Sequence, residues 1–368
     1  MAGLSVDLVK KLEQGKRQSA RLTTIAALAN ALDVPMSELT DKRPRLDGAG
    51  DRLVLALRDT LLSPDLLVGV DPADDGEPTP LAELAAAVDR AWADYWAGRF
   101  VELARTVPAL IAEARLAHHL LGVTVSRALA EAYEIAACLL VHLGREDLAA
   151  VSAERGIAAA AGGEDELLWA VLHGSYAWAL IGQARHREAE QVAIRAAERI
   201  EPRFTTATPE QLTVWGGLVL WAMAGAVEGN RPEAAQDYIS LSRVAAARMD
   251  RDRHDYQVNF GPTQVAMQTT YAHAVAGQPD KALTAAQGVR REDLFTISYG
   301  RHLLDVAQAY TDGRRDDAAV DVLHEAKDLA PVWFRHQPVA RSLVTEIRER
   351  KTRPSNALRD LVRSLSPH

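Results

Sequence analysis

One spacing pattern recurs along most of the chain and limits what it can fold into. A predicted helix ends in glycine, and an alanine stands five positions later. The pairs are Gly144 and Ala149, Gly229 and Ala234, Gly277 and Ala282, Gly313 and Ala318, a looser Gly98 and Leu103, and a copy with Ala184 before Ala189. Small residues on both sides of a turn let two helices pack closely, so the pattern predicts successive helix pairs. An irregular bundle would explain one copy but not the repeated spacing.

The composition agrees with a nearly all-α chain. Apolar residues make up 48% of it and charged residues 25%, which is ordinary for a globular protein. Alanine is abundant, and runs of β-branched residues are few. The single cysteine excludes a disulfide framework and a thiolate zinc site within one chain. The most apolar stretch, residues 215–227, is too short to cross a bilayer, so we expect a cytoplasmic protein without membrane contact.

Residues 80–335 resemble tetratricopeptide repeats, in which a small residue of the first helix meets an alanine of the second. The six turns are 46, 40, 45, 48 and 36 residues apart, whereas the usual period of the family is about 34 residues. Longer helices or loops are therefore expected in most copies. The resemblance implies a right-handed α-solenoid over residues 81–366, with the first helix of each repeat lining a concave face.

The groove positions of that repeat family, carried over to this chain, define a candidate ligand-binding surface. They fall on Trp92, Tyr95, Trp96, Glu131, Glu134, His142, Trp178, Gln264 and Tyr271, and also on Cys138, Met223, Met267 and Tyr310. Aromatic rings beside carboxylates suit an amphipathic small molecule or a peptide. Aromatic residues in such arrays also fill the core between repeats, and that alternative stays open.

The sequence NFGPT, residues 259–263, interrupts the chain just before a predicted helix. Asn259 or Thr263 is expected to cap that helix, because both residue types accept hydrogen bonds from free backbone N–H groups. Turn formation and capping are favoured over contact with a ligand.

The first residues carry a different pattern. Ser5 is suited to cap a helix in which Leu8, Val9 and Leu12 form an apolar stripe, and Gly15 ends it. Residues 1–46 have a net charge of +3, which leaves −11 for the rest of the chain. A small basic head on an acidic body is typical of a DNA-contacting module fused to another domain.

The segments GLSVDLVKKLEQGKR and LTTIAALANALDVPMSEL, within residues 3–39, resemble the Cro/C1-type (XRE-family) helix-turn-helix domain. They match its turn, its recognition helix and the two helices that follow. Counterparts of the first two family helices are missing before Gly3, so we expect a partial head over residues 1–45. The resemblance implies DNA contacts by Ser5, Val6, Asp7, Lys10, Lys11, Lys16, Arg17 and Arg21.

Residues 254–275 and 301–331 are similar to segments of actinobacterial regulators that join such a head to tetratricopeptide repeats. The resemblances imply a homodimeric transcriptional regulator that binds double-stranded DNA and senses a small molecule or peptide. Residues 46–80 would connect head and body through one short helix at 51–62. The alternative is a stand-alone repeat scaffold that does not bind DNA.

Catalytic motifs are missing from the sequence. It contains no glycine-rich phosphate loop followed by lysine, no Gly-x-Ser-x-Gly elbow and no His-Glu-x-x-His motif. We therefore expect no enzyme activity, no cofactor and no metal.

Overall fold

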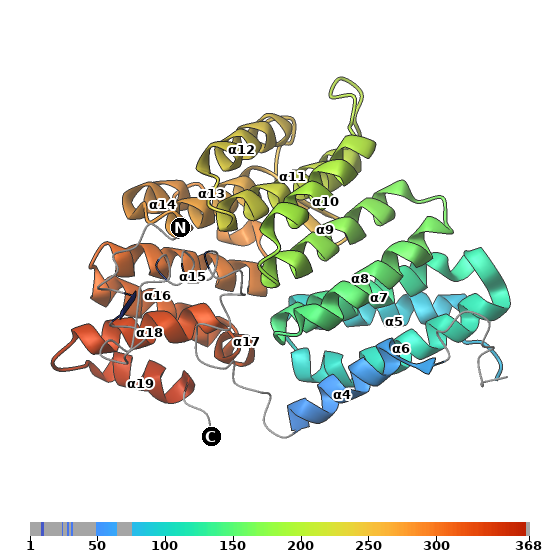
Figure 1. The fold of residues 1–368 in the computed structure, drawn as a ribbon, viewed down its shortest axis with the longest axis horizontal. Coiled ribbons are helices and arrows are strands. Elements are labelled where there is room, and N and C mark those ends of the chain that lie inside the picture. Colours follow the sequence, from blue (N-terminus) through green and yellow to red (C-terminus); the bar gives the residue numbers. More distant parts are fainter. Residues whose placement is uncertain are drawn as a thin grey trace.

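The computed structural model describes residues 49–64 and 76–365, together with isolated positions before residue 32. The described chain is almost entirely helical, as the sequence predicted (Figure 1). In chain order its α-helices are α4 (Ala49–Leu61), α5 (Leu81–Trp96), α6 (Phe100–Leu121), α7 (Ser126–His142), α8 (Glu146–Ala161), α9 (Glu166–Gly182), α10 (His186–Arg199), α11 (Pro209–Glu228), α12 (Pro232–Ala246), α13 (Pro262–Val275), α14 (Pro279–Ala286), α15 (Thr296–Asp312), α16 (Asp316–Leu329), α17 (Pro331–Arg335), α18 (Pro338–Arg350) and α19 (Asn356–Leu365).

Successive helices from α5 to α16 pack against one another along the chain, each next to its predecessor. The row of helices bends strongly, so that α4 to α8 and α15 to α19 form the two arms of an arc, with α9 to α14 between them (Figure 1). Helix α4 also belongs to this body, because its buried Leu57 and Leu61 join the same apolar core as α6. Short 3-10 turns lie at Gly122–Val125 and Arg291–Asp293.

Each helix pair is joined by the same backbone turn. One residue adopts a left-handed conformation, its N–H bonds to the carbonyl three residues earlier, and the next N–H bonds to the carbonyl five residues before itself. The left-handed residues are Gly98, Gly144, Ala184, Asn230, Gly277 and Arg314. Five positions after each stands a fully or almost fully buried residue, namely Leu103, Ala149, Ala189, Ala235, Ala282 and Ala319.

Two of these turns correct the register predicted from the sequence. Gly229 and Gly313 end their helices with negative φ values, and the left-handed conformation falls one residue later, on Asn230 and Arg314. The alanines that pack in the second helices are accordingly Ala235 and Ala319, whereas the predicted Ala234 and Ala318 are only half-buried. The constant feature is therefore the five-residue spacing in sequence between the left-handed residue and the buried residue. Glycine occupies the left-handed position in three of the six turns.

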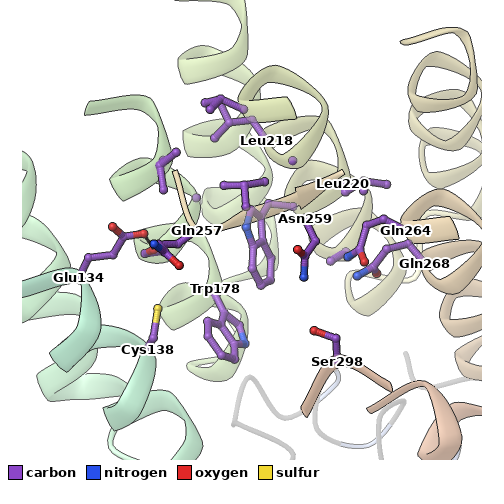
Figure 2. A pocket seen from close by; sticks show the side chains of 18 of the residues that line it. Glu134, Cys138, Trp178, Leu218, Leu220, Gln257, Asn259, Gln264, Gln268 and Ser298 are labelled. Carbon is purple, nitrogen blue, oxygen red and sulfur yellow. Dashed lines mark hydrogen bonds between the residues drawn. The ribbon is translucent and has the colours of Figure 1, made fainter. Parts of the chain in front are cut away.

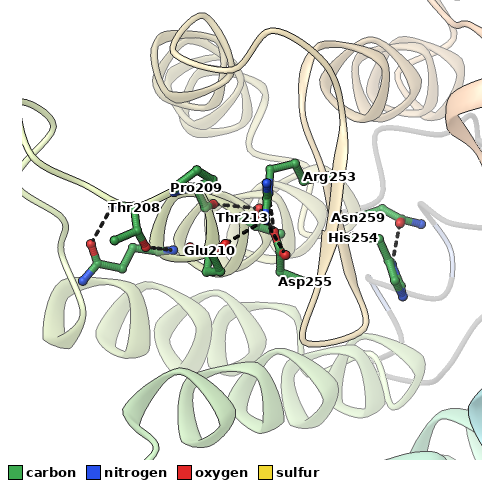
Figure 3. Close-up of polar contacts among 9 residues, drawn as sticks. Thr208, Pro209, Glu210, Thr213, Arg253, His254, Asp255 and Asn259 are labelled. Carbon is green, nitrogen blue, oxygen red and sulfur yellow. Dashed lines mark hydrogen bonds and ion pairs between the residues drawn. The ribbon is translucent and has the colours of Figure 1, made fainter. Parts of the chain in front are cut away.

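A two-stranded antiparallel hairpin, β1 (Arg253–Asp255) and β2 (Val258–Phe260), interrupts the helices between α12 and α13. It lies against the N-terminal half of α11, where an added Cβ at Gly216 would collide with the Phe260 ring. The start of α11 holds the hairpin by polar contacts, because Thr213 Oγ1 donates to Asp255 and Arg253 pairs with Glu210 at 2.7 Å (Figure 3).

Asp252 caps the start of α13, in place of the predicted Asn259 or Thr263. Its carboxylate accepts hydrogen bonds from the backbone N–H groups of Thr263 and Gln264, both at 2.7 Å. Gly261 permits this approach, because its φ of 153° suits glycine and an added Cβ would lie 2.5 Å from Asp252 Cα. Asn259 instead bonds across the hairpin to His254 (Figure 3).

The two arms of the arc meet at the turn after α5. Gly98 lies against Ile297 of α15 and Trp333 of α17, and the Trp96 ring stacks on Phe295 with centroids 4.7 Å apart. One continuous apolar core accordingly contains buried residues from α4 to α9 and from α15 to α19. Within the described ranges, no helix is long and apolar enough to cross a bilayer.

The turn geometry predicts opposite effects for two alanine-to-glycine changes. Ala184 has a φ of 61°, so Ala184→Gly relieves a left-handed conformation and should raise the free energy of unfolding by about 0.5–1 kcal/mol. Ala247→Gly is the control, because Ala247 is exposed with a right-handed backbone and should lose up to about 1 kcal/mol. Urea unfolding of both variants measures the difference. Equal destabilisation would contradict the shared turn geometry.

Candidate ligand-binding cavity

A central cavity lies on the inner side of the arc, between the walls formed by α5, α7, α9, α11, α13 and α15. Its inner part holds about 850 Å³ of empty space, and its wider outer part about 1820 Å³. The two parts share lining residues, among them Tyr95, Trp96, Trp178 and Gln264, so they are continuous. Figure 2 shows Glu134 and Cys138 on one side, Gln264 and Gln268 on the other, and Trp178 between them.

Eight of the nine predicted groove residues line this cavity: Trp92, Tyr95, Trp96, Glu134, His142, Trp178, Gln264 and Tyr271. Glu131 does not line it. Its carboxylate pairs with Arg127 at 2.9 Å, next to the hairpin residue Tyr256, whose ring lies under the Arg127 guanidinium. Of the further groove positions, Cys138 and Met267 also line the cavity. Met223 is instead fully buried in the core, and Tyr310 packs outside the cavity against Arg315.

The predicted DNA-contacting residues are placed only in part. Lys10 is helical and exposed. Ser5, Val6, Asp7, Lys11, Lys16, Arg17 and Arg21 lie outside the residues that the structure describes.

Aromatic rings form much of the cavity wall. On α5, the ring of Tyr95 meets Trp92 and Trp96 edge-on, with centroids 5.5 and 4.9 Å apart. On the neighbouring wall, Trp178 of α9 stacks on Trp221 of α11 at 5.5 Å. His142 lies between the two groups, since its ring contacts Trp178 at 5.1 Å and its Nε2 is 3.3 Å from the Tyr95 hydroxyl. Offset and edge-on contacts of this kind hold large rings in fixed orientations.

Glu134 is the one carboxylic acid in the inner part of the cavity. It is 3% exposed, and Ser175 donates the one hydrogen bond that its carboxyl receives within the described residues, at 3.3 Å. The pKa of Glu134 is raised to about 8, mainly by burial and also by the Glu131 carboxylate, while the Ser175 hydrogen bond and the Arg127 charge oppose the rise. Burial next to Glu134 likewise raises the pKa of the Cys138 thiol and of the Tyr95 hydroxyl, so all three groups hold their protons at neutral pH.

A second polar group stands in the outer part. The Tyr271 hydroxyl donates to Glu228 at 2.5 Å, and the Arg301 guanidinium lies over the Tyr271 ring and 3.3 Å from Asp305. Burial raises the pKa of Asp305 to about 6, and the Arg301 charge opposes this. These four side chains come from α11, α13 and α15, so they tie the wall of the cavity together across three helices.

The hairpin supplies lining residues that the sequence analysis did not select. Gln257, Val258 and Asn259 reach into the inner part, and Gln257 Oε1 accepts a hydrogen bond from the Trp96 indole at 2.8 Å. Trp221, Ser175, Gln268 and Ser298 were missed as well. The sequence could have identified Gln268. It follows Gln264 by one helical turn, so both amides lie on the same face of α13.

The described residues contain no group of three or more histidine, cysteine, aspartate or glutamate side chains that could hold a metal ion. His118 Nε2 lies 3.2 Å from the Ser126 hydroxyl. No protein-family model matches the chain, and no match was found among curated proteins or solved structures.

The raised pKa of Glu134 predicts a pH dependence of stability. Between pH 4.5 and about 8, the unfolded chain has lost the Glu134 proton and the folded chain still holds it, so stability falls as pH rises through this window. Glu134→Gln should remove this slope and gain about 3 kcal/mol near neutral pH. Two other buried groups contribute below about pH 6.5 and nearly cancel: Asp305, whose pKa is raised to about 6, adds a slope of the same sign, and His302, whose pKa burial lowers to about 4, adds one of opposite sign.

Urea unfolding at several pH values measures the effect. Glu102→Gln is the control, because it removes one carboxylate from an exposed position on α6. An unchanged slope in Glu134→Gln would show that the Glu134 carboxyl ionises at an ordinary pH.

Proposed function

We propose that the chain is a DNA-binding transcriptional regulator whose helical body senses a small ligand in the central cavity. The observation that carries the sensing part is the position of eight predicted side chains around one cavity. These residues were selected from repeat positions spread over residues 92–271, so their meeting in space is not a result of nearness in sequence. Concave, largely apolar pockets with a few polar groups are the usual form of a small-molecule site.

The size and closure of the cavity favour a small molecule over a peptide. The two arms meet at Trp96 and Phe295, and the hairpin fills part of the inner face, so an extended chain has less room here than along an open concave face. Pre-formed cavities that bury most of their ligand suit compact molecules.

The DNA-binding part of the proposal rests on the first 46 residues. They resemble the recognition-helix half of a Cro/C1-type head and carry a net charge of +3, while the rest of the chain carries −11. Lysine and arginine contacts to phosphates supply most of the non-specific affinity for DNA, so such a charge separation favours binding through the head alone. The resemblance to tetratricopeptide repeats and the homodimer remain parts of the same proposal.

Helix α4 offers a physical route between ligand and head. It follows the head directly in sequence, and its Leu57 and Leu61 pack into the core that also contains Trp92 and Tyr95 of the cavity wall. A ligand that favours one arrangement of α5 and α7 would therefore bias the position of α4. Ligand binding shifts such an equilibrium only when the two arrangements bind the ligand with different affinities.

Selection from a library of random DNA duplexes tests the regulator function. The chain should enrich a site with two half-sites, about one helical turn apart. The double change Lys11→Glu with Arg17→Glu should abolish enrichment without lowering the unfolding midpoint, because phosphate and base contacts are lost from the head. The matched control is Arg90→Glu with Arg105→Glu, which makes the same charge change at exposed positions of the body.

Two results would contradict regulation through this head. The unaltered chain could enrich no sequence, which would favour the stand-alone scaffold. Alternatively, the charge reversals in the body could weaken DNA binding as much as the charge reversals in the head.

A further inference from the structure

We propose that the inner part of the cavity binds a small organic ammonium ion, held by tryptophan rings and by Glu134 as its counter-ion. This inference names the class of ligand for the sensing role proposed above and rests on it. It follows from the composition of the inner wall, from the position of Glu134, and from two polar atoms that lack partners.

The inner wall combines many aromatic rings with one acid and no base. Among the described residues, four tryptophans and one tyrosine line it, Glu134 is the one aspartate or glutamate, and no lysine, arginine or histidine contributes. The faces of aromatic rings attract cations within about 6 Å, and tryptophan is the strongest of them. An anionic ligand would meet no positive group in this part of the cavity.

Within residues 49–64 and 76–365, no cationic side chain pairs with Glu134 inside the cavity. Arg127, the nearest positive charge on the helix of Glu134, pairs with Glu131 and with Asp165, which stands directly before α9. The groups that influence the carboxyl are Glu131, Arg127 and Cys138 on α7, Tyr95 on α5 and Ser175 on α9. A buried carboxylate without a counter-ion is costly, so the empty site keeps its proton and a bound cation would favour its release.

Two polar atoms in the wall have no hydrogen-bond partner in the part of the chain that the structure describes. They are the Trp92 indole Nε1, on a side chain that is 3% exposed, and the amide oxygen of Gln264. Buried polar groups are normally satisfied, so these two atoms mark places where a ligand contributes. The Gln264 oxygen can accept from an ammonium N–H or a hydroxyl, and the Trp92 N–H can donate to an oxygen of the ligand.

The opposite side of the cavity carries neutral polar groups. Gln264, Gln268 and Ser298 face Glu134 and Cys138 across the tryptophans (Figure 2). A ligand with an ammonium group at one end and a hydroxyl, carbonyl or amide at the other would match both sides. A neutral ligand could bond to the amides of Gln264 and Gln268, but it would offer no positive charge to the Glu134 carboxyl.

Choline and its neutral carbon isostere 3,3-dimethyl-1-butanol test the charge of the ligand, because the two differ only in the nitrogen. Binding to the full chain is measured by calorimetry in buffers of different ionisation enthalpy. Choline should bind at least about tenfold more tightly than the isostere, since cation–π contacts and the Glu134 charge both favour it. Below pH 8 its binding should release close to one proton, and its affinity should rise by up to about tenfold per pH unit.

Three variants locate the effect. Glu134→Gln should abolish proton release and remove most of the preference for choline, leaving only the smaller preference that the aromatic rings supply, with isostere binding within about threefold of the unaltered chain. Trp178→Leu keeps an apolar wall but removes a ring, and should weaken choline binding by about 5- to 30-fold. Glu131→Gln is the matched control on the same helix, outside the cavity, and should keep the preference for choline.

Equal affinities for choline and its isostere at about pH 6 and about pH 8 would overturn the proposal. Proton release that persists in Glu134→Gln would overturn the counter-ion role, and failure of choline to bind at millimolar concentration would overturn the ligand class. The DNA selection contains no ammonium ion, so its result is independent of all three outcomes. A regulator that senses a different kind of molecule is thereby distinguished from a chain that does not bind DNA.

Discussion

The cavity depends on the contact between the turn after α5 and the helices α15 and α17. If Trp96 did not stack on Phe295, and Gly98 did not accept Ile297 and Trp333 beside it, the same helices would form an open concave face. Glu134 itself is buried among Tyr95, Cys138 and Ser175, which come from α5, α7 and α9. Closure places Gln264, Gln268 and Ser298 of the more distant helices α13 and α15 around the same space.

The hairpin supports the contact between the arms through defined apolar and polar contacts. Phe260 packs where Gly216 leaves room on α11, and this fixes the hairpin so that Gln257, in the turn between its strands, reaches the cavity and its amide oxygen accepts from the Trp96 indole. At the other end, Arg253, Asp255 and Thr213 tie the hairpin to the first turns of α11. The contact between the arms is thus supported by a segment that belongs to neither of them.

Local rules explain how much of this fold and site could be predicted. The helix pairs were predictable because a left-handed turn followed by a small buried residue leaves a trace in short sequence spacing. The register failed at Asn230 and Arg314, since these residues adopt the left-handed conformation next to a glycine that suggested the wrong position. Trp92, Trp96 and Trp178 could be assigned to the inner face because the resemblance to tetratricopeptide repeats implies groove positions at fixed distances before each turn.

What could not be predicted depends on contacts between distant segments. Asp252 replaces Asn259 as the cap of α13 because the hairpin folds back and brings an acid eleven residues away to Thr263. Ser175, Trp221 and the hairpin residues line the cavity only because α9 and α11 turn these positions inward and the arms close over them. Glu131 and Glu134 stand one helical turn apart on α7, yet Arg127 neutralises the first and leaves the second alone.

The difference between Glu131, which is paired with Arg127, and Glu134, which is not, also bears on how a bound ligand could affect α4. The empty cavity keeps Glu134 neutral, so its walls are held together by apolar contact and few polar links. An occupant that ionises Glu134 would add an attraction between α7 and whatever wall holds the occupant's other end, here α13 and α15. Because the arms already touch where Trp96 stacks on Phe295 and Gly98 lies against Ile297 and Trp333, such an added link would reinforce an existing contact between them. The position of α4 changes only if the ligand binds the closed arrangement of the arms more tightly than the open one. A high affinity that is equal for both arrangements would not move it.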